Sequence, residues 1–278
     1  MIQNLTVEDA HKKIIGTIRS FFKKAGAKSA VIGLSGGIDS AVVMALAAEA
    51  LGKDNVHGIL MPSQFSTLHS IADAVALAEN IGCSYNMVSI EPIFNRYLKE
   101  LSVIFEGTEP DVTEENLQAR IRGTILMAYS NKFKALLLNT SNKSELSVGY
   151  GTLYGDLSGA MMVIADLYKV EVYELARYIN RERTIIPESS ITKAPSAELR
   201  NEQKDTDSLP DYAVMDPILY AMNELGKTES DLKLEYDEKT VERVARLRRG
   251  ASFKVHQIPP ILKVGDKPLA YPQKWIEE

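Results

Sequence analysis

The sequence predicts an α/β protein with a doubly wound parallel sheet, a Rossmann-like arrangement, in a single domain with a C-terminal helical extension. Short apolar segments alternate with longer stretches of helical periodicity. The first three apolar segments start about 26 to 29 residues apart, which suits a strand followed by a crossover helix. These segments lack alternating polar positions, as expected when helices cover both faces of a sheet.

The elements follow in a regular order. An amphipathic helix is predicted first, over residues 7–24, with Ile14, Ile18 and Phe22 on one side. Four strands are predicted next, and right-handed crossovers should connect them. The strands cover residues 30–34, 56–60, 85–88 and 135–138. The helices between and around them cover residues 39–51, 66–81, 91–104 and 113–132, so the last crossover carries two helices.

The pattern changes after residue 183. Residues 184–214 are rich in Pro, Ser, Asp and Lys and show little periodicity. Because a long irregular loop in a compact domain is usually functional or mobile, we predict a mobile active-site loop over residues 184–210. Helices are expected again near residues 214–225 and 238–249. A mostly extended C-terminal tail is expected over residues 251–278.

Composition narrows the function classes. The chain has 278 residues and a formal net charge of −5, so no overall positive field favours nucleic acid. Cys83 is its one cysteine, which excludes an internal disulfide and a zinc site with several cysteines. The four histidines are scattered without metal-ligand spacing. No signal peptide and no long apolar run is evident, so we expect a cytoplasmic protein without membrane contact.

The turn after the first strand carries the clearest chemistry. It reads Gly33, Leu34, Ser35, Gly36, Gly37, Ile38, Asp39 and Ser40, between an apolar strand and an apolar helix. Two adjacent glycines let backbone N–H groups approach an anion, and the helix N-terminus points at the same place. Asp39 would repel a phosphate unless a cation lay between them. The turn therefore predicts a nucleoside triphosphate bound with Mg²⁺.

This turn resembles the pyrophosphate loop of the ATP pyrophosphatases, which cleave ATP between the α and β phosphates. A Walker A loop serves γ-phosphoryl transfer instead. The nearest approach to that motif, Gly226-Lys227-Thr228, has Ala221 at the first glycine position and follows a helical pattern. We interpret it as an ordinary helix end.

A second polar turn, residues 139–145, follows the fourth strand. Thr140 could bind a ribose or a phosphate. Glu145 has two open readings: a second carboxylate that holds Mg²⁺ together with Asp39, or a solvent-facing acid after a helix cap. Ligands of doubly wound sheets lie beyond the carboxyl ends of the strands. Residues 35–40, 61–66 and 139–145 should therefore face one cleft.

Four motifs together resemble NAD synthetase over about residues 10–262. They are the pyrophosphate loop, Glu115 to Arg122, Asn139 to Asp156, and Lys193 to Leu199. The resemblance implies a fold of the ATP pyrophosphatase type and the last step of NAD biosynthesis. ATP adenylates the nicotinate carboxyl of deamido-NAD and releases pyrophosphate, and ammonia then displaces AMP to give NAD. Adenylation is needed because a carboxylate is anionic and resists nucleophiles.

The resemblance also implies a set of site residues. Gly33 to Ser40, Thr140, Lys169 and Ser196 would bind ATP, with Asp39 and Lys169 as catalytic residues. Mg²⁺ would be held by Asp39 and Glu145. Deamido-NAD would be bound by Asn116, Arg120, Tyr150, Thr152 and Lys254. An ordinary solvated helix face stays an alternative for Arg120, and a plain helix-start lysine for Lys169.

Several positions depart from the ammonia-dependent members. The chain has Leu153, Ala160 and Phe253 where those members often have Lys, Asp and His, so these three are not assigned a role. At such points it is closest to the synthetase domain of the glutamine-dependent enzymes, without their glutaminase domain. We expect free ammonia as the nitrogen donor, and a separate glutaminase partner stays possible.

The resemblance implies a homodimer with the dinucleotide at the subunit interface and helix 113–132 as an interface element. Arg243, Arg246, Arg248, Arg249 and Lys254 form a basic cluster that could attract the dinucleotide or simply complement a helix C-terminus. The sequence leaves two other functions open: another pyrophosphate-loop amidotransferase or tRNA-modifying enzyme, and a non-catalytic adenine-nucleotide sensor.

Overall fold

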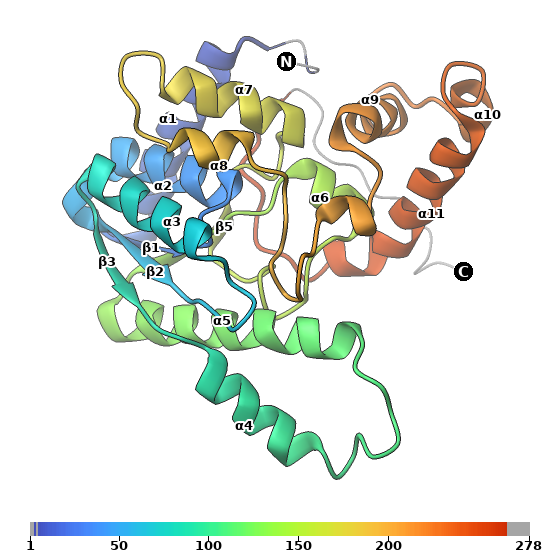
Figure 1. The fold of residues 1–278 in the computed structure, drawn as a ribbon. Coiled ribbons are helices and arrows are strands. Elements are labelled where there is room, and N and C mark those ends of the chain that lie inside the picture. The colour runs from blue at the N-terminus through green and yellow to red at the C-terminus, as the bar shows by residue number, and fades with distance from the viewer. Residues whose placement is uncertain (1–2, 4, 266–278) are drawn as a thin grey trace.

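A five-stranded, fully parallel sheet forms the centre of the molecule, in the order β3-β2-β1-β4-β5 (Figure 1). The computed structural model describes residue 3 and residues 5–265. The strands are β1 (Ala30–Leu34), β2 (Val56–Leu60), β3 (Ser84–Met87), β4 (Leu136–Asn139) and β5 (Met161–Met162). The predicted α/β fold class and the four predicted strands are confirmed, with shifts of one residue at β3 and β4. β5 was not predicted, because two residues are too few to show a pattern.

Helices connect and flank the strands. Before β4 in the chain they are α1 (Val7–Ala25), α2 (Ile38–Leu51), η1 (Lys53–Asn55), α3 (Leu68–Ile81), α4 (Glu91–Leu101) and α5 (Val112–Phe133). After β4 they are α6 (Lys143–Val148), α7 (Lys169–Ile179), α8 (Glu188–Thr192), η2 (Asp205–Asp207), α9 (Tyr212–Asn223), α10 (Glu229–Leu232) and α11 (Glu238–Val255). The expected pair of helices in the last crossover is present as α4 and α5.

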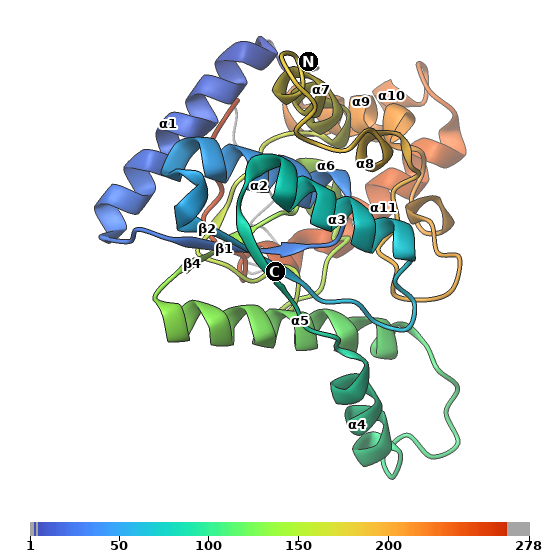
Figure 2. The same ribbon diagram turned by 60° about the vertical axis from the view of Figure 1, so that its left-hand side comes forward.

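Helices cover both faces of the sheet, as Figures 1 and 2 show. On one face α1, α2, α3 and α7 enclose the largest apolar cluster, which includes Ile14, Ile32 and Met44. On the other face α5 and the start of α4 pack against residues such as Val31, Ile59 and Leu137. The helix α2 is apolar all round because it lies buried against the sheet and its neighbouring helices. The doubly wound arrangement is thereby confirmed.

Helix ends follow local sequence signals. Thr6 accepts a hydrogen bond from the N–H of Asp9 at the start of α1, and Gly26 ends that helix with φ of 65°. The long helix α5 begins with a capping box in which Asp111 accepts from the N–H of Thr113 and Glu114 accepts from the N–H of Asp111. These signals explain why the predicted helix boundaries lie close to the observed ones.

A separate group of helices forms the C-terminal extension. α6, α9, α10 and α11 share an apolar cluster that includes Met215, Leu219, Leu232 and Val244. Figure 1 shows α9 to α11 together at one flank of the sheet. The extension packs through α6 next to the turn that follows β4, so it supports one wall of the region beyond the strand ends.

The predicted extended tail begins later than expected. Residues 251–255 are the last turn of α11, so the expectation of an extended chain from residue 251 was wrong there. The chain then returns to the sheet, where Ile261 forms a parallel bridge with Met162 and the N–H of Leu262 donates to the Met162 carbonyl. This covers the β5 edge. The rest of the predicted tail, residues 266–278, lies outside the described residues.

Candidate active site

One pocket of about 310 Å³ lies beyond the carboxyl ends of β1, β2 and β4. Its wall includes residues from all three turns that the sequence placed at one cleft, for example Ser35, Pro62 and Thr140. The prediction of a shared cleft is confirmed. Residues 190 and 193–199 also line the pocket, so part of the predicted loop 184–210 lies against it.

The turn at residues 35–40 leaves the N-terminus of α2 open to the pocket. Gly37 is the N-cap residue and offers no side chain to bond the free N–H groups of the first turn. Gly36 has φ of 79°, and a Cβ atom there would lie 2.1 Å from the carbonyl oxygen of Ser70, so only glycine fits. Ser40 Oγ donates to the Gly37 carbonyl at 3.1 Å. The turn thus has the geometry of an anion cradle.

Asp39 and Lys169 form an ion pair at the edge of this cradle. Lys169 Nζ donates to Asp39 Oδ2 and lies 3.5 Å from Glu145 Oε1. Asn142 Nδ2 donates to Asp39 Oδ1 at 3.0 Å, which fixes the carboxylate further. Lys169 is the first residue of α7, and its side chain is only 3% exposed. The lysine is therefore a buried cation rather than a plain surface residue at a helix start.

Glu145 is a helix-capping residue and also lines the pocket. It is the third residue of α6 and completes a capping box with Asn142: its N–H donates to Asn142 Oδ1 at 3.0 Å, and its Oε2 accepts from the N–H of Asn142 at 3.2 Å. The other carboxylate oxygen faces Lys169 and the pocket. The expectation of a solvent-facing acid is wrong, because the helix start itself lies at the pocket.

The electrostatics of the three groups are linked. Burial, reinforced by the neighbouring Asp39 carboxylate, raises the pKa of Glu145 to about 8. Burial alone would lower the pKa of Lys169, but the Asp39 and Glu145 carboxylates outweigh it and raise that pKa above its ordinary value. A second cation beside Asp39 and Glu145 would favour the ionised form of Glu145.

The donor set suits Mg²⁺ better than a softer metal. Asp39 and Glu145 supply carboxylate oxygens at the cradle, and Mg²⁺ typically takes one or two carboxylates together with substrate phosphates. Within residue 3 and residues 5–265, no group of three or more His, Cys, Asp or Glu side chains could hold a metal by itself. A metal here would thus be bound partly by these carboxylates and partly by phosphate oxygens of the substrate.

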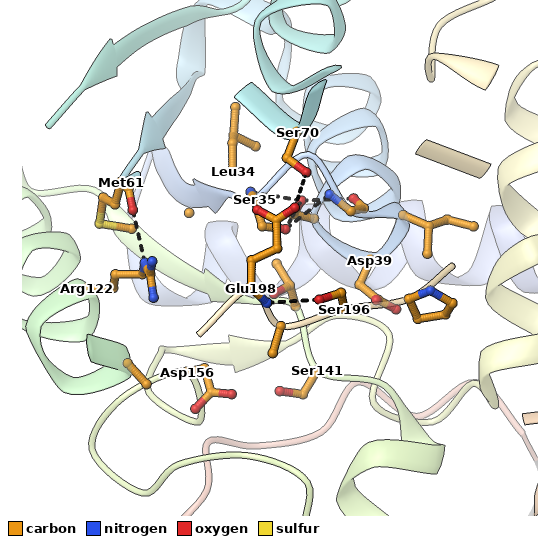
Figure 3. Close-up of a pocket in the computed structure, with 18 of the residues that line it drawn as sticks. Leu34, Ser35, Asp39, Met61, Ser70, Arg122, Ser141, Asp156, Ser196 and Glu198 are labelled. Atoms are coloured by element: carbon orange, nitrogen blue, oxygen red, sulfur yellow. Dashed lines mark hydrogen bonds between the residues drawn. The ribbon is translucent and has the colours of Figure 1, made fainter. Parts of the chain in front are cut away.

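The other predicted ATP residues also lie at the pocket. Thr140 lines it directly after β4. Ser196 lines it from the loop, and its Oγ donates to the Gln203 carbonyl at 2.5 Å. The same Oγ accepts from the N–H of Glu198 at 3.1 Å, the bond drawn in Figure 3. The hydroxyl of Ser196 therefore also shapes its own loop.

The five predicted dinucleotide residues gather around the turn after α6, and four of them, all but Tyr150, lie outside the pocket lining. Thr152 Oγ1 donates to Asn116 Oδ1 at 2.6 Å, and Arg120 Nε donates to the Leu153 carbonyl at 3.3 Å. Lys254 Nζ donates to the carbonyls of Gly149 and Gly151, at 2.7 and 2.6 Å. Of the five, Tyr150 lines the main pocket. Tyr150 and Lys254 both line a smaller adjoining cavity, which Glu145 also reaches.

Sequence reasoning missed four side chains at the site. Asp205 is buried and accepts hydrogen bonds from the hydroxyls of Tyr150 and Tyr212, at 3.1 and 2.9 Å. Arg122 lines the pocket and donates through Nε to the Met61 carbonyl at 3.0 Å; burial lowers its pKa to about 10. Asn142 holds Asp39. Glu198 joins the loop to α3. Arg122, Asn142 and Glu198 lie inside the quoted motifs, whereas Asp205 carries no local signal.

Comparisons with known proteins identify the family to which the chain belongs. The family model of NAD synthase matches residues 10–258. A glutamine-dependent NAD(+) synthetase of Synechocystis sp. is 48% identical over 261 residues, which are 94% of this chain and 47% of that protein. The chain therefore spans about half the length of such relatives. This agrees with the motif-level resemblance to their synthetase domain.

Two solved structures are similar along nearly the whole chain. A glutamine-dependent NAD+ synthetase of Acinetobacter baumannii in complex with ADP is 38% identical with a TM-score of 0.67, over 96% of this chain and 48% of that one. An NH3-dependent NAD synthetase of Campylobacter jejuni is 31% identical with a TM-score of 0.74, over 93% of this chain and 100% of that one. With the family model covering most of its length, the chain belongs to the NAD synthase family.

Proposed function

We propose that this chain catalyses the ATP-dependent amidation of deamido-NAD by ammonia, giving NAD, AMP and pyrophosphate. The observation that carries the proposal is the open N-terminus of α2 beside the Asp39–Lys169–Glu145 cluster, in a chain of this family. An anion cradle next to two carboxylates and a buried lysine suits a metal-bound triphosphate whose pyrophosphate leaves.

The first half-reaction activates the carboxyl group. The nicotinate carboxylate oxygen attacks the α phosphorus of ATP, the bond between the α and β phosphates breaks, and pyrophosphate leaves. N–H groups of the cradle would bind the departing phosphates, and the Lys169 ammonium would offset the charge that develops on them. Asp39 and Glu145 would hold Mg²⁺, which supplies Lewis-acid neutralisation of the phosphate oxygens when bound.

In the second half-reaction the ammonia nitrogen bonds to the activated carbonyl carbon, the bond between that carbon and the phosphate oxygen breaks, AMP leaves with the oxygen, and one proton is released. The one cysteine, Cys83, lies outside the pocket, is buried, and has a pKa raised to about 11 by burial. A thiol in that state does not suit a glutaminase nucleophile. Ammonia itself is thus the proposed nucleophile at this site, whether free or delivered by a glutaminase partner.

The proposed function also implies a binding region for the dinucleotide and an assembly of two chains. Tyr150 and its neighbours around residues 149–156 would receive the dinucleotide. We also propose a homodimer with α5 at the interface, the loop of residues 184–210 as a mobile cover, and a cytoplasmic location. Within the described ranges, no helix is long and apolar enough to cross a membrane.

The direct test is an assay of the purified protein with ATP, Mg²⁺ and deamido-NAD, comparing ammonium with glutamine as nitrogen donor. We expect NAD, AMP and pyrophosphate in equal amounts with ammonium, and no NAD with glutamine. Pyrophosphate release without NAD from either donor would show adenylation and point to a partner that delivers ammonia. No pyrophosphate release with either donor would overturn the proposal and favour a nucleotide sensor.

A further inference from the structure

Residues 193–199, here termed the lid segment, form part of the pocket wall and are held from two sides. On one side Lys193 Nζ donates to Asp73 Oδ2 on α3 at 3.1 Å. On the other side Gln118 Nε2 on α5 donates to the Leu199 carbonyl at 2.8 Å. All seven residues line the pocket. Opening the pocket at this point would require the lid segment to leave α3, α5 or both.

Glu198 makes the densest contact between the lid segment and α3. Its Oε1 accepts from Ser70 Oγ at 2.6 Å and from Thr67 Oγ1 at 3.0 Å, and its Oε2 accepts from the N–H of Thr67 at 3.3 Å. Thr67 is the N-cap residue of α3, so the carboxylate lies at the positive end of that helix. Figure 3 shows the Glu198 side chain reaching Ser70.

The backbone of Glu198 is held in a costly conformation. Its φ is 49°, in the left-handed region that residues with a side chain rarely occupy. Such a conformation persists only where surrounding contacts impose it. The three hydrogen bonds to Thr67 and Ser70 are contacts of this kind.

The contact between Glu198 and Ser70 is connected by packing to the turn at residues 35–40. The backbone of Ser70 lies directly against Gly36, where an added Cβ would approach the Ser70 carbonyl oxygen to 2.1 Å. From the segment preceding the lid, Ser190 Oγ donates to the Gly36 carbonyl at 3.0 Å. The segment from Ser190 to Glu198 is therefore tied to the cradle at both of its ends.

We propose that Glu198 is a positioning residue that latches the lid segment onto the start of α3 and keeps water from the adenylated intermediate. The inference rests on the proposed function. Where water reaches the intermediate, its oxygen bonds to the activated carbonyl carbon, the acyl–phosphate oxygen bond breaks, and deamido-NAD and AMP are formed with loss of a proton. ATP is then converted to AMP and pyrophosphate without NAD.

Glu202 provides a matched control for the latch. It lies a few residues further on, is exposed, and has a similar φ of 51°. A change to alanine at either position removes a glutamate from a left-handed site. Only the change at Glu198 removes the bonds to α3.

The test compares Glu198→Ala, Glu198→Gln and Glu202→Ala with the unaltered chain, in the presence of ATP, Mg²⁺, deamido-NAD and ammonium. We expect the ratio of AMP to NAD formed to stay near one for the unaltered chain and Glu202→Ala, and to rise severalfold for Glu198→Ala. Glu198→Gln should lie between them, because an amide oxygen still accepts from Ser70 and Thr67. A ratio near one for Glu198→Ala, with lowered turnover only, would overturn the latch.

Limited trypsin digestion tests the latch independently of the reaction. Cleavage after Lys193 and Arg200 should be roughly tenfold faster in Glu198→Ala, since losing a charge-assisted hydrogen bond shifts an opening equilibrium by about that factor. Equal rates in the Glu198 and Glu202 variants would contradict the latch. If the unaltered chain forms no AMP while digestion behaves as expected, the proposed function fails and the latch stands.

Discussion

At the scale of single residues, the site depends on charges held in place by groups that do not react. Asp39 accepts from both Lys169 and Asn142, and Asn142 also caps the helix that carries Glu145. One asparagine therefore sets the positions of both carboxylates proposed to hold Mg²⁺. Such outer contacts commonly decide the affinity of a metal site.

Asp39→Asn is expected to lower the rate of pyrophosphate release by roughly 100-fold or more, because a charged metal contact at a developing charge is lost. The midpoint of the Mg²⁺ titration should move to higher concentration. Thermal melting followed by circular dichroism should show that the variant is folded. An unchanged rate with an unchanged Mg²⁺ midpoint would remove Asp39 from the metal site.

Asn142→Ala should weaken Mg²⁺ binding even though the residue is not a proposed ligand. It removes the hydrogen bond to Asp39 and the N-cap of α6 together. Loss of the cap alone costs about 1 kcal/mol of folding free energy. Asn142→Ser keeps a cap acceptor but lacks the amide N–H that bonds Asp39, so it should restore stability and not Mg²⁺ affinity. Equal Mg²⁺ affinity in all three proteins would contradict this role.

Cys83 is expected to be inert in the folded chain. It is buried between the end of α3 and the start of β3. Burial raises the pKa of its thiol to about 11, so the thiolate is rare at neutral pH. A disulfide-exchange reagent at pH 8 should label it only in denaturant. Rapid labelling of the native protein would show that this region opens.

At the scale of elements, the short connections that follow the strands form the proposed site. The turn from β1 to α2 presents open N–H groups because Gly37 cannot cap the helix. The start of α3 packs on that turn so tightly that Gly36 has no room for a side chain. The cradle, α3 and the lid segment therefore form one mechanical unit.

Gly36→Ala should disrupt this unit without damaging the sheet. The new Cβ would collide with the Ser70 backbone, and the φ of 79° would be unfavourable for alanine. We expect both loss of ATP binding by calorimetry and faster trypsin cleavage in the lid segment. Gly16→Ala on α1 is a suitable control, since a Cβ there meets nothing within 4 Å. ATP affinity equal to that of the control would contradict the tight packing.

At the scale of the whole molecule, a buried polar network joins distant parts of the chain. Lys143 at the start of α6 is fully buried and forms ion pairs with Asp166 at 2.9 Å and Glu224 at 2.5 Å. Asp166 Oδ2 also accepts from the N–H groups of Val264 and Gly265. The network holds the C-terminal extension and the returning chain against the sheet behind the site.

Lys143→Met is expected to lower the free energy of unfolding by about 3–5 kcal/mol, because it leaves two buried carboxylates without their cation. Urea denaturation measures this directly. Lys12→Met, which removes an exposed ion pair with Glu8, should change the stability by less than about 1 kcal/mol. A Lys143 variant as stable as the Lys12 variant would show that the network contributes little.

The features that could be predicted from the sequence are those that depend on interactions between neighbouring residues. Apolar strand segments, capping residues and the glycine turn with Asp39 act within a few neighbouring residues, so they could be predicted with close boundaries. Family motifs added Lys169 and Glu145, which the fold brings to the same pocket.

Features that depend on burial and on contacts between distant segments emerge only in the folded chain. Tertiary structure made Glu145 a partly buried pocket carboxylate as well as a cap, and it brought Asp205 to Tyr150 and Glu198 to Ser70 across 55 and 128 positions of the chain. It also placed the chain after α11 on the β5 edge, which no periodicity indicates. Desolvation and long-range hydrogen bonds exist only once the chain is packed, so the linear pattern carries no direct trace of them.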